Sequence, residues 1–204
     1  MDKKTNNNGY DYVDLDLPSG TLWASCNVGA SKPLDYGLYF QWGDTKGYTK
    51  EQVGKDKQFN WHSYKWYNDD GSIIFSKYTT TGESLELDDD AAHVNMGGSW
   101  HMPTPEQVQE LIDNTTKECI SLEGIKCMKF TSKKDISKCI FIPLSGYAWD
   151  DSVEDTDECC LVWASKLSSY RVNNGEYLYL TSKRAHLYSN QGRSNGFPVR
   201  GVIG

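Results

Sequence analysis

The chain has 204 residues and carries 21 Lys and Arg against 28 Asp and Glu, which gives a formal net charge of −7 and a pI near 5.1. Nucleic acid attracts basic surfaces, so this charge argues against nucleic acid as the partner. No run of eighteen apolar residues occurs, and membrane insertion is therefore not expected. Seven Trp, thirteen Tyr and eighteen Gly favour short strands and tight turns over helices.

The first part of the chain predicts strands and loops. Residues 1–9 are polar with nothing to bury, and we expect a disordered lead-in before one domain over residues 10–204. The alternating stretch 12–17, a Pro-Ser-Gly turn and the stretch 22–26 predict a β-hairpin. A further aromatic strand is expected in "YGLYFQWGD". Residues 46–86 form a long polar region, which we expect either to pack by its own aromatic side chains or to carry function.

The clearest helix signal is "MPTPEQVQELIDN". Thr104 fits the N-cap, Pro105 fits the first helical position and Gln107 completes a capping box. The apolar stripe of this helix consists of Val108, Leu111 and Ile112. Strands are expected around a polar turn in residues 124–147, and again in "VWASKL", "GEYLYLTS" and "AHLYSN". With no internal repeat or linker, the chain predicts a single α+β domain.

Two acidic runs resemble cation sites only superficially. "LELDDDAAHVN" lacks the alternating oxygens and the Gly of a calcium loop, so we expect Asp88, Asp89 and Asp90 to cap a helix start or a turn. "WDDSVEDTDECC" is interpreted as a solvated loop, with a calcium site as the alternative. No metal site and no cofactor are predicted.

The residues that could support catalysis lack a recognisable arrangement. The six cysteines form no paired CxxC motifs, and we expect mostly free thiols, with one or two bridges as the alternative. No His lies in a signature such as GxSxG, and His101, just before the helix cap, is expected to pack in a loop. GxGxxG, P-loop and HExxH motifs are absent from the sequence. We therefore predict no catalytic residue and a protein that is not an enzyme.

Four ordered segments carry a family resemblance. "YVDLDLPSGTLWASCNVGA", "DYGLYFQWGD", "DDAAHVNMGGSWHMPT" and "IFIPLSGY" resemble the Fibrobacter succinogenes major paralogous domain family of gut-bacterial surface proteins and their phages. The resemblance covers nearly the whole chain from Tyr10. It implies a C-type-lectin-like fold of the formylglycine-generating-enzyme-like subtype, loop-rich with mixed, twisted sheets of short strands and about two helices.

The enzyme branch of that fold uses a spaced pair of reactive cysteines and bound metal. Neither Cys159 and Cys160, which are adjacent, nor Cys139 matches such a pair, so the resemblance does not carry the activity over. The chain also departs from the family by His101, where an Arg is usual, and by its ending "FPVRGVIG".

The closing segment, about residues 163–204, looks like the variable region of a diversity-generating retroelement target protein. In such proteins a reverse-transcribed template with randomised adenines replaces the end of the gene. Randomising an AAC codon gives any codon that ends in C, which includes Asn, Tyr, His, Ser, Arg, Gly and Thr but excludes Lys, Glu, Gln, Trp and Met. Gly192 is reachable by this rule, whereas Glu176, Lys183 and Gln191 are not.

The positions that this resemblance marks as the ligand-binding surface alternate with apolar ones. Leu178, Leu180, Ala185 and Leu187 are expected to face the core. The predicted binding residues are Ser169, Tyr170, Arg171, Asn173, Tyr177, Tyr179, Thr181, Arg184, His186, Tyr188, Asn190 and Ser194. The framing residues "GRSNGFPVRG" are expected to anchor the segment, with Arg200 paired inside the domain.

The sequence therefore predicts a binding protein whose partner is a protein or glycan receptor on a target cell. Tyr, Ser, Asn, Gly and Arg are the residues that build adaptable binding surfaces. We expect a phage tail tip or a bacterial surface adhesin, located on the virion tail or the cell surface, with oligomers possible through a larger assembly. The first ten residues lack the apolar stretch of a secretory signal. Two alternatives stay open: an enzyme on the same scaffold, and an undiversified structural surface domain.

Overall fold

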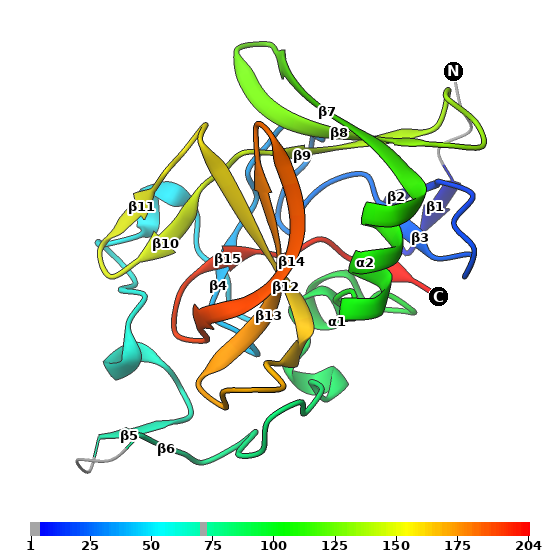
Figure 1. Cartoon of the computed structure of the whole chain (residues 1–204). Coiled ribbons are helices and arrows are strands. Elements are labelled where there is room, and N and C mark those ends of the chain that lie inside the picture. Colours follow the sequence, from blue (N-terminus) through cyan, green and yellow to red (C-terminus); the bar gives the residue numbers. More distant parts are fainter. Residues whose placement is uncertain (1–4, 70–72) are drawn as a thin grey trace.

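A computed structural model describes residues 5–69 and 73–204 of the chain (Figure 1). The described residues form two α-helices, α1 (Ala91–Met96) and α2 (Pro105–Asn114). The strands are β1 (Thr5–Asn7), β2 (Tyr10–Asp14), β3 (Leu22–Ala24), β4 (Tyr39–Phe40), β5 (Tyr67–Asp69), β6 (Ile73–Phe75), β7 (Thr115–Leu122), β8 (Ile125–Ser132), β9 (Cys139–Pro143), β10 (Tyr147–Trp149), β11 (Ser152–Glu154), β12 (Cys159–Leu167), β13 (Asn174–Thr181), β14 (Arg184–Gly192), β15 (Phe197–Pro198) and β16 (Val202–Ile203).

These strands form several small sheets. The order is β12-β13-β14 in the central sheet, β7-β8-β9 in a second sheet, and β1-β2-β3-β16 in a third that joins the two ends of the chain; β4 pairs β15, β5 pairs β6 and β10 pairs β11. The prediction of a loop-rich α+β fold with about two helices is confirmed. The expectation of mixed sheets is wrong for the described strands, because every ladder between them is antiparallel.

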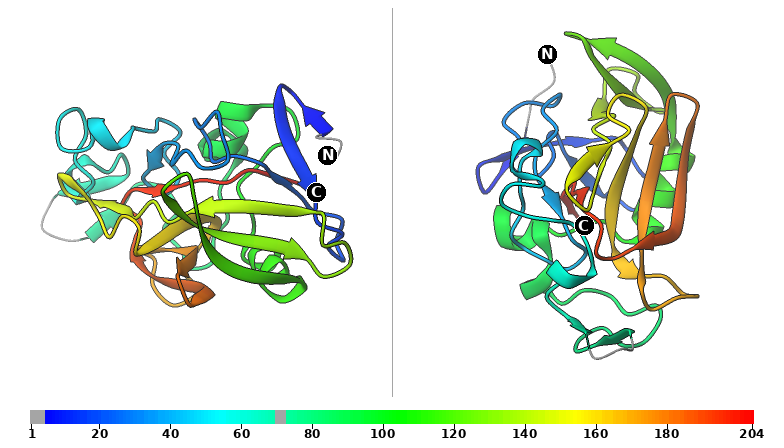
Figure 2. Two further views of the ribbon diagram at one scale, coloured as in Figure 1. Left: turned by 90° about the horizontal axis from the view of Figure 1, so that it is seen from above. Right: turned by 90° about the vertical axis from the view of Figure 1, so that its left-hand side faces the viewer.

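One face of the central sheet is buried in the core, and the other face is partly buried and partly exposed. Alternating residues Leu178 and Leu180 of β13 pack into a core shared with Val108 and Leu111 of α2. In Figure 1, α2 lies beside β14, and in the right-hand view of Figure 2 the outer strand of this sheet forms the margin of the molecule. β14 is thus an edge strand, since the sheet order ends with it.

The expected disordered lead-in over residues 1–9 is wrong for residues 5–9, whereas residues 1–4 lie outside the described part. β1 pairs with β2 in an antiparallel register. The carbonyl of Asn7 accepts a hydrogen bond of 3.0 Å from the buried Trp100 Nε1. Polar composition misled the prediction because polar groups of this segment make the contacts: its backbone pairs with β2, and the Asn8 side chain donates to the Met96 carbonyl.

Most predicted elements of the first half are confirmed. β2 and β3 form the expected hairpin, and Thr104 and Gln107 form the capping box of α2. The sequence predicts a cap at Asp88 to Asp90 but not helix α1 itself. In the structure the Asp90 side chain caps α1 and accepts a hydrogen bond of 2.9 Å from the His93 amide. β7 was also unpredicted, and it pairs with all eight residues of β8.

The long segment 46–86 packs by its own aromatic side chains. Tyr64, Trp66, Phe75 and Tyr78 are all buried in the core that also contains Trp163 and Tyr177. A cluster of charged and polar side chains holds the end of this segment in place, because the Asp89 carboxylate accepts hydrogen bonds from Lys65, Lys77 and Tyr78. No helix in the described part of the chain is long and apolar enough to cross a membrane.

Two fully buried arginines anchor the C-terminal segment, as expected for the framing residues. Arg200 donates to the Asn27 Oδ1 atom at 2.9 Å and to the carbonyls of Ala24 and Phe141 at 2.9 and 2.8 Å. Arg193 donates to the Tyr78 carbonyl at 2.8 Å. These bonds tie the end of the chain to segments more than fifty residues away, and so they fix the strands that precede it.

Candidate binding surface

The hairpin β13–β14 presents the predicted binding positions in register. The cross-strand pairs are Tyr177 with Tyr188, Tyr179 with His186, and Thr181 with Arg184, while Leu178 pairs with Leu187. Directly opposed residues share a face of a sheet. The alternation in the sequence therefore places the tyrosines and their polar partners on one face and the leucines on the other.

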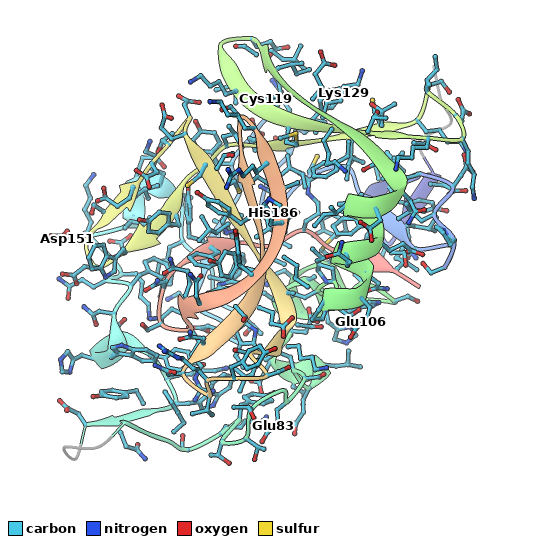
Figure 3. All side chains as sticks on the ribbon, in the orientation of Figure 1. Glu83, Glu106, Cys119, Lys129, Asp151 and His186 are labelled. Carbon is cyan, nitrogen blue, oxygen red and sulfur yellow. The ribbon has the colours of Figure 1, made fainter. Side chains whose placement is uncertain are left out.

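The predicted residues divide by exposure into three groups. Seven are exposed: Ser169, Tyr170, Arg171, Arg184, His186, Tyr188 and Asn190. Three are half-buried: Asn173, Tyr179 and Thr181. Two are buried: Tyr177 and Ser194. The exposed residues lie in the loop between β12 and β13 and along edge strand β14, and Figure 3 labels His186 on that strand.

Tyr177 is a core residue, and the prediction that it faces outward is wrong. Its side chain is only 3% exposed and packs edge-on against Trp163 and Phe197, with ring centroids 6.1 and 5.4 Å away. The Tyr177 hydroxyl donates to the Asn190 Oδ1 atom at 2.5 Å. The face that carries Tyr177 is covered at this end of the hairpin by other core aromatics, which strand alternation alone does not reveal.

Ser194 is also buried, and its predicted place on the surface is wrong. Its backbone carbonyl accepts a hydrogen bond of 2.8 Å from Gln41 Nε2. The preceding residue is the buried Arg193, and the following strand β15 pairs with β4. Ser194 therefore belongs to the anchoring part of the C-terminal segment.

A hollow of about 330 Å³ opens on the tyrosine face, and we call it the tyrosine hollow. It is lined by Tyr147, Asp155, Tyr177, Tyr179, Tyr188 and Asn190. The Tyr188 ring lies 5.7 Å from that of Tyr179, at an angle of 58°, and 6.4 Å from that of Tyr177, at 43°. The tilted rings form walls around the hollow and not a flat platform.

Three phenols of this hollow, those of Tyr147, Tyr177 and Tyr179, have raised pKa values and are protonated at neutral pH. Burial is the main cause that raises the pKa of Tyr147, Tyr177 and Tyr179, and nearby Asp155 adds to the increase for Tyr147 and Tyr179. A neutral phenol presents its aromatic face and can donate a hydrogen bond. The hollow therefore offers rings and hydroxyls together with one carboxylate.

Part of the hollow comes from outside the C-terminal segment. Tyr147 lies on β10 and Asp155 follows β11, and both had been missed as candidate site residues. The sequence predicts Asp155 in a solvated loop, with a calcium site as the alternative. The pairing of β12 with β13 sets Cys159 opposite Thr181 and brings this upstream loop to the tyrosines. Such a long-range pairing leaves no local signal in the sequence.

Cys159 and Cys160 are poor nucleophiles in this structure. All six have free thiols, which confirms the expectation for them. Cys159 lies at the tyrosine hollow, where burial, with Cys160 and two carboxylates nearby, raises the pKa of its thiol to about 12. Burial also raises the pKa of the Cys160 thiol. Reactive cysteines need the opposite shift, toward the thiolate.

Other candidate chemistry is not assembled by the fold. In the described part of the chain, no three His, Cys, Asp or Glu side chains converge to hold a metal ion. His101 lies against backbone, with its ring nitrogens 2.9 and 3.1 Å from the carbonyls of Met102 and Gly204, as expected for a packed loop residue. A larger hollow of about 670 Å³ lies between Tyr36, Leu122 and Phe141, and no predicted binding residue lines it.

Comparison with known proteins adds no relative. No family model, curated protein or solved structure matches this chain.

Proposed function

We propose that this protein is a non-enzymatic binding protein that recognises a protein or glycan receptor on a target cell through the exposed face of its C-terminal segment. One observation carries the proposal. In hairpin β13–β14 the apolar positions Leu178 and Leu180 are buried, while seven predicted binding positions stay exposed on the adjoining loop and the edge strand. Side chains there can change without loss of core packing.

The retroelement resemblance offers an explanation for this division into buried and exposed positions. Every one of the seven exposed positions carries a residue that a randomised AAC codon can encode. The anchors Arg193 and Arg200 hold the segment from the inside, so the same scaffold supports different outer residues. We propose display on a phage tail or a bacterial surface, where several copies in one assembly would bind more strongly together than one copy alone.

The same proposal extends to the fold. The two helices, the small twisted sheets and the long aromatic segment 46–86 support a C-type-lectin-like domain of the formylglycine-generating-enzyme-like subtype. The buried thiols of Cys159 and Cys160, with raised pKa values, favour binding over thiol oxidation on this scaffold.

The experiment compares cell binding by the unchanged chain and by a triple variant, Tyr170→Ala, Arg184→Ala and His186→Ala. Fluorescently labelled protein is applied to a panel of gut-bacterial strains and bound protein is measured by flow cytometry. Aromatic and Arg residues dominate binding energy at interfaces, so we expect binding to fall at least about tenfold. The melting temperature should stay within about 2 °C, because all three side chains are exposed.

The matched control replaces three exposed residues outside this surface, Glu118→Ala, Lys134→Ala and Ile136→Ala. This control should bind the cells as the unchanged chain does. Equal binding by the triple variant, or loss of binding by the control instead, would contradict the proposed surface.

A further inference from the structure

The tyrosine hollow has the features of an aromatic cage with a single charged wall. Four rings surround it, from Tyr147, Tyr177, Tyr179 and Tyr188, and Asp155 supplies the carboxylate. Aromatic faces carry partial negative charge and attract cations, most strongly where water is excluded. The rings and the carboxylate thus favour the same kind of ligand, one with a positive charge on an apolar surface.

The Asp155 carboxylate is available to such a ligand. Among the described residues, no Lys, Arg or His side chain forms an ion pair with it. Its backbone is held in place, since the Asp155 carbonyl accepts from the amides of Glu158 and Cys159 at 3.0 and 3.1 Å. An exposed carboxylate that forms no ion pair, on a backbone held by hydrogen bonds at the wall of an aromatic hollow, is complementary in charge to a cation.

The amide oxygens of the hollow are less available. The Asn190 Oδ1 atom already accepts from the Tyr177 hydroxyl, and the Gln191 Oε1 atom accepts from Asn195 Nδ2 at 3.1 Å. A sugar needs many free hydrogen-bonding groups to fix its hydroxyls, whereas a quaternary ammonium group has no N–H to satisfy. The volume of about 330 Å³ lies at the lower end for ligand sites and suits a head group.

We propose that the tyrosine hollow binds a quaternary ammonium group, as carried by choline. The inference deepens the proposed function and rests on it, because it names the chemistry that one part of the binding surface recognises. Tyr147 and Asp155 are a fixed half of the cage, outside the C-terminal segment. Tyr179 and Tyr188 are a half that adenine randomisation can remake, so the preference for a cation belongs to this particular sequence.

The first experiment titrates choline and its neutral carbon isostere, 3,3-dimethylbutan-1-ol, into the unchanged chain by calorimetry. We expect choline to bind and the isostere to bind at least about tenfold more weakly, because only choline carries the charge. Equal affinity for the two, or no choline binding at millimolar concentrations, would overturn the proposal.

Variants then locate the site. Tyr188→Leu keeps an apolar side chain at a partly exposed position and removes one ring, and Asp155→Asn removes only the charge. Each should weaken choline binding about three- to tenfold, with the melting temperature unchanged. Tyr170→Leu is the matched control, an exposed tyrosine outside the hollow, and it should leave choline affinity as it is. Unchanged affinity in both cage variants would overturn the assignment.

A final comparison distinguishes the source of the ammonium group. A neighbouring hollow of about 580 Å³ shares Asp155 and Tyr179 and adds Lys183 and Arg184, whose charges suit a phosphate. If the source is phosphocholine, it should bind more tightly than choline, and Arg184→Gln should remove only that gain. If the source is a modified protein, Nα-acetyl-trimethyllysine amide should bind more tightly than choline.

The two proposals fail separately. The triple variant described above replaces no residue that lines the tyrosine hollow, so its choline affinity and its cell binding are measured separately. If choline does not bind but the triple variant loses cell binding, the receptor-binding proposal is retained and the aromatic cage is rejected. If choline binds and the triple variant still binds cells fully, the aromatic cage is retained and the proposed receptor-binding surface is rejected.

Discussion

Replacing Arg200 with Met is expected to lower the free energy of unfolding by about 3 kcal/mol or more. The substitution removes three hydrogen bonds from a side chain with no exposed surface, so the Asn27 Oδ1 atom and the carbonyls of Ala24 and Phe141 lose a donor. Met keeps most of the volume, so the loss reports on hydrogen bonding more than on a cavity. Chemical denaturation followed by tryptophan fluorescence measures it.

An exposed arginine provides the comparison. Arg171→Met, in the loop between β12 and β13, should change the free energy of unfolding by about 0.5 kcal/mol or less. A small effect of Arg200→Met would mean that the carbonyls find other partners and that Arg200 does not anchor the C-terminal segment.

The two paired tyrosines of the hairpin, Tyr177 and Tyr188, should differ in how much stability each contributes. Tyr177→Ala is expected to cost about 3 kcal/mol or more of the free energy of unfolding, because its buried ring leaves a cavity against Trp163 and Phe197. Tyr188→Ala, directly opposite on β14 and 41% exposed, should cost about 1 kcal/mol or less. Thermal and denaturant unfolding of both variants checks the difference.

This pair tests how the face is divided. Equal losses in the two variants would show that β14 is as much part of the core as β13. Loss of cell binding in Tyr177→Ala would be uninformative about recognition when the fold is weakened, so binding is read from exposed positions only.

Local sequence patterns predicted the helices and strands that are specified by contacts within a few residues of each other. The capping box of Thr104 and Gln107 specified α2, and the alternation of Leu178 and Leu180 specified which face of β13 enters the core. The cap at Asp90 was recognised without its helix, since α1 has only six residues and too few turns for a periodic signal.

Contacts between distant segments could not be predicted in this way. Tyr177 lies on the polar-looking face of its strand, yet Trp163 and Phe197 cover it. Asp155 belongs to an acidic loop that is indistinguishable in sequence from any solvated turn, and only the β12–β13 pairing brings it to the tyrosines. The sequence therefore predicted the candidate site residues on β13 and β14 and missed Tyr147 and Asp155.

Sequencing of the gene region that encodes residues 163–204 across many natural copies, together with the neighbouring DNA, distinguishes a diversified binding surface from an unchanging one. We expect a reverse-transcriptase gene and a near-copy of the last hundred-odd nucleotides, with substitutions only at template adenines. Codons for the exposed Tyr170, His186 and Tyr188 should vary, and the codon for Arg200 should not. Variation spread evenly over exposed and buried codons, or no such template, would contradict a surface that is diversified for binding.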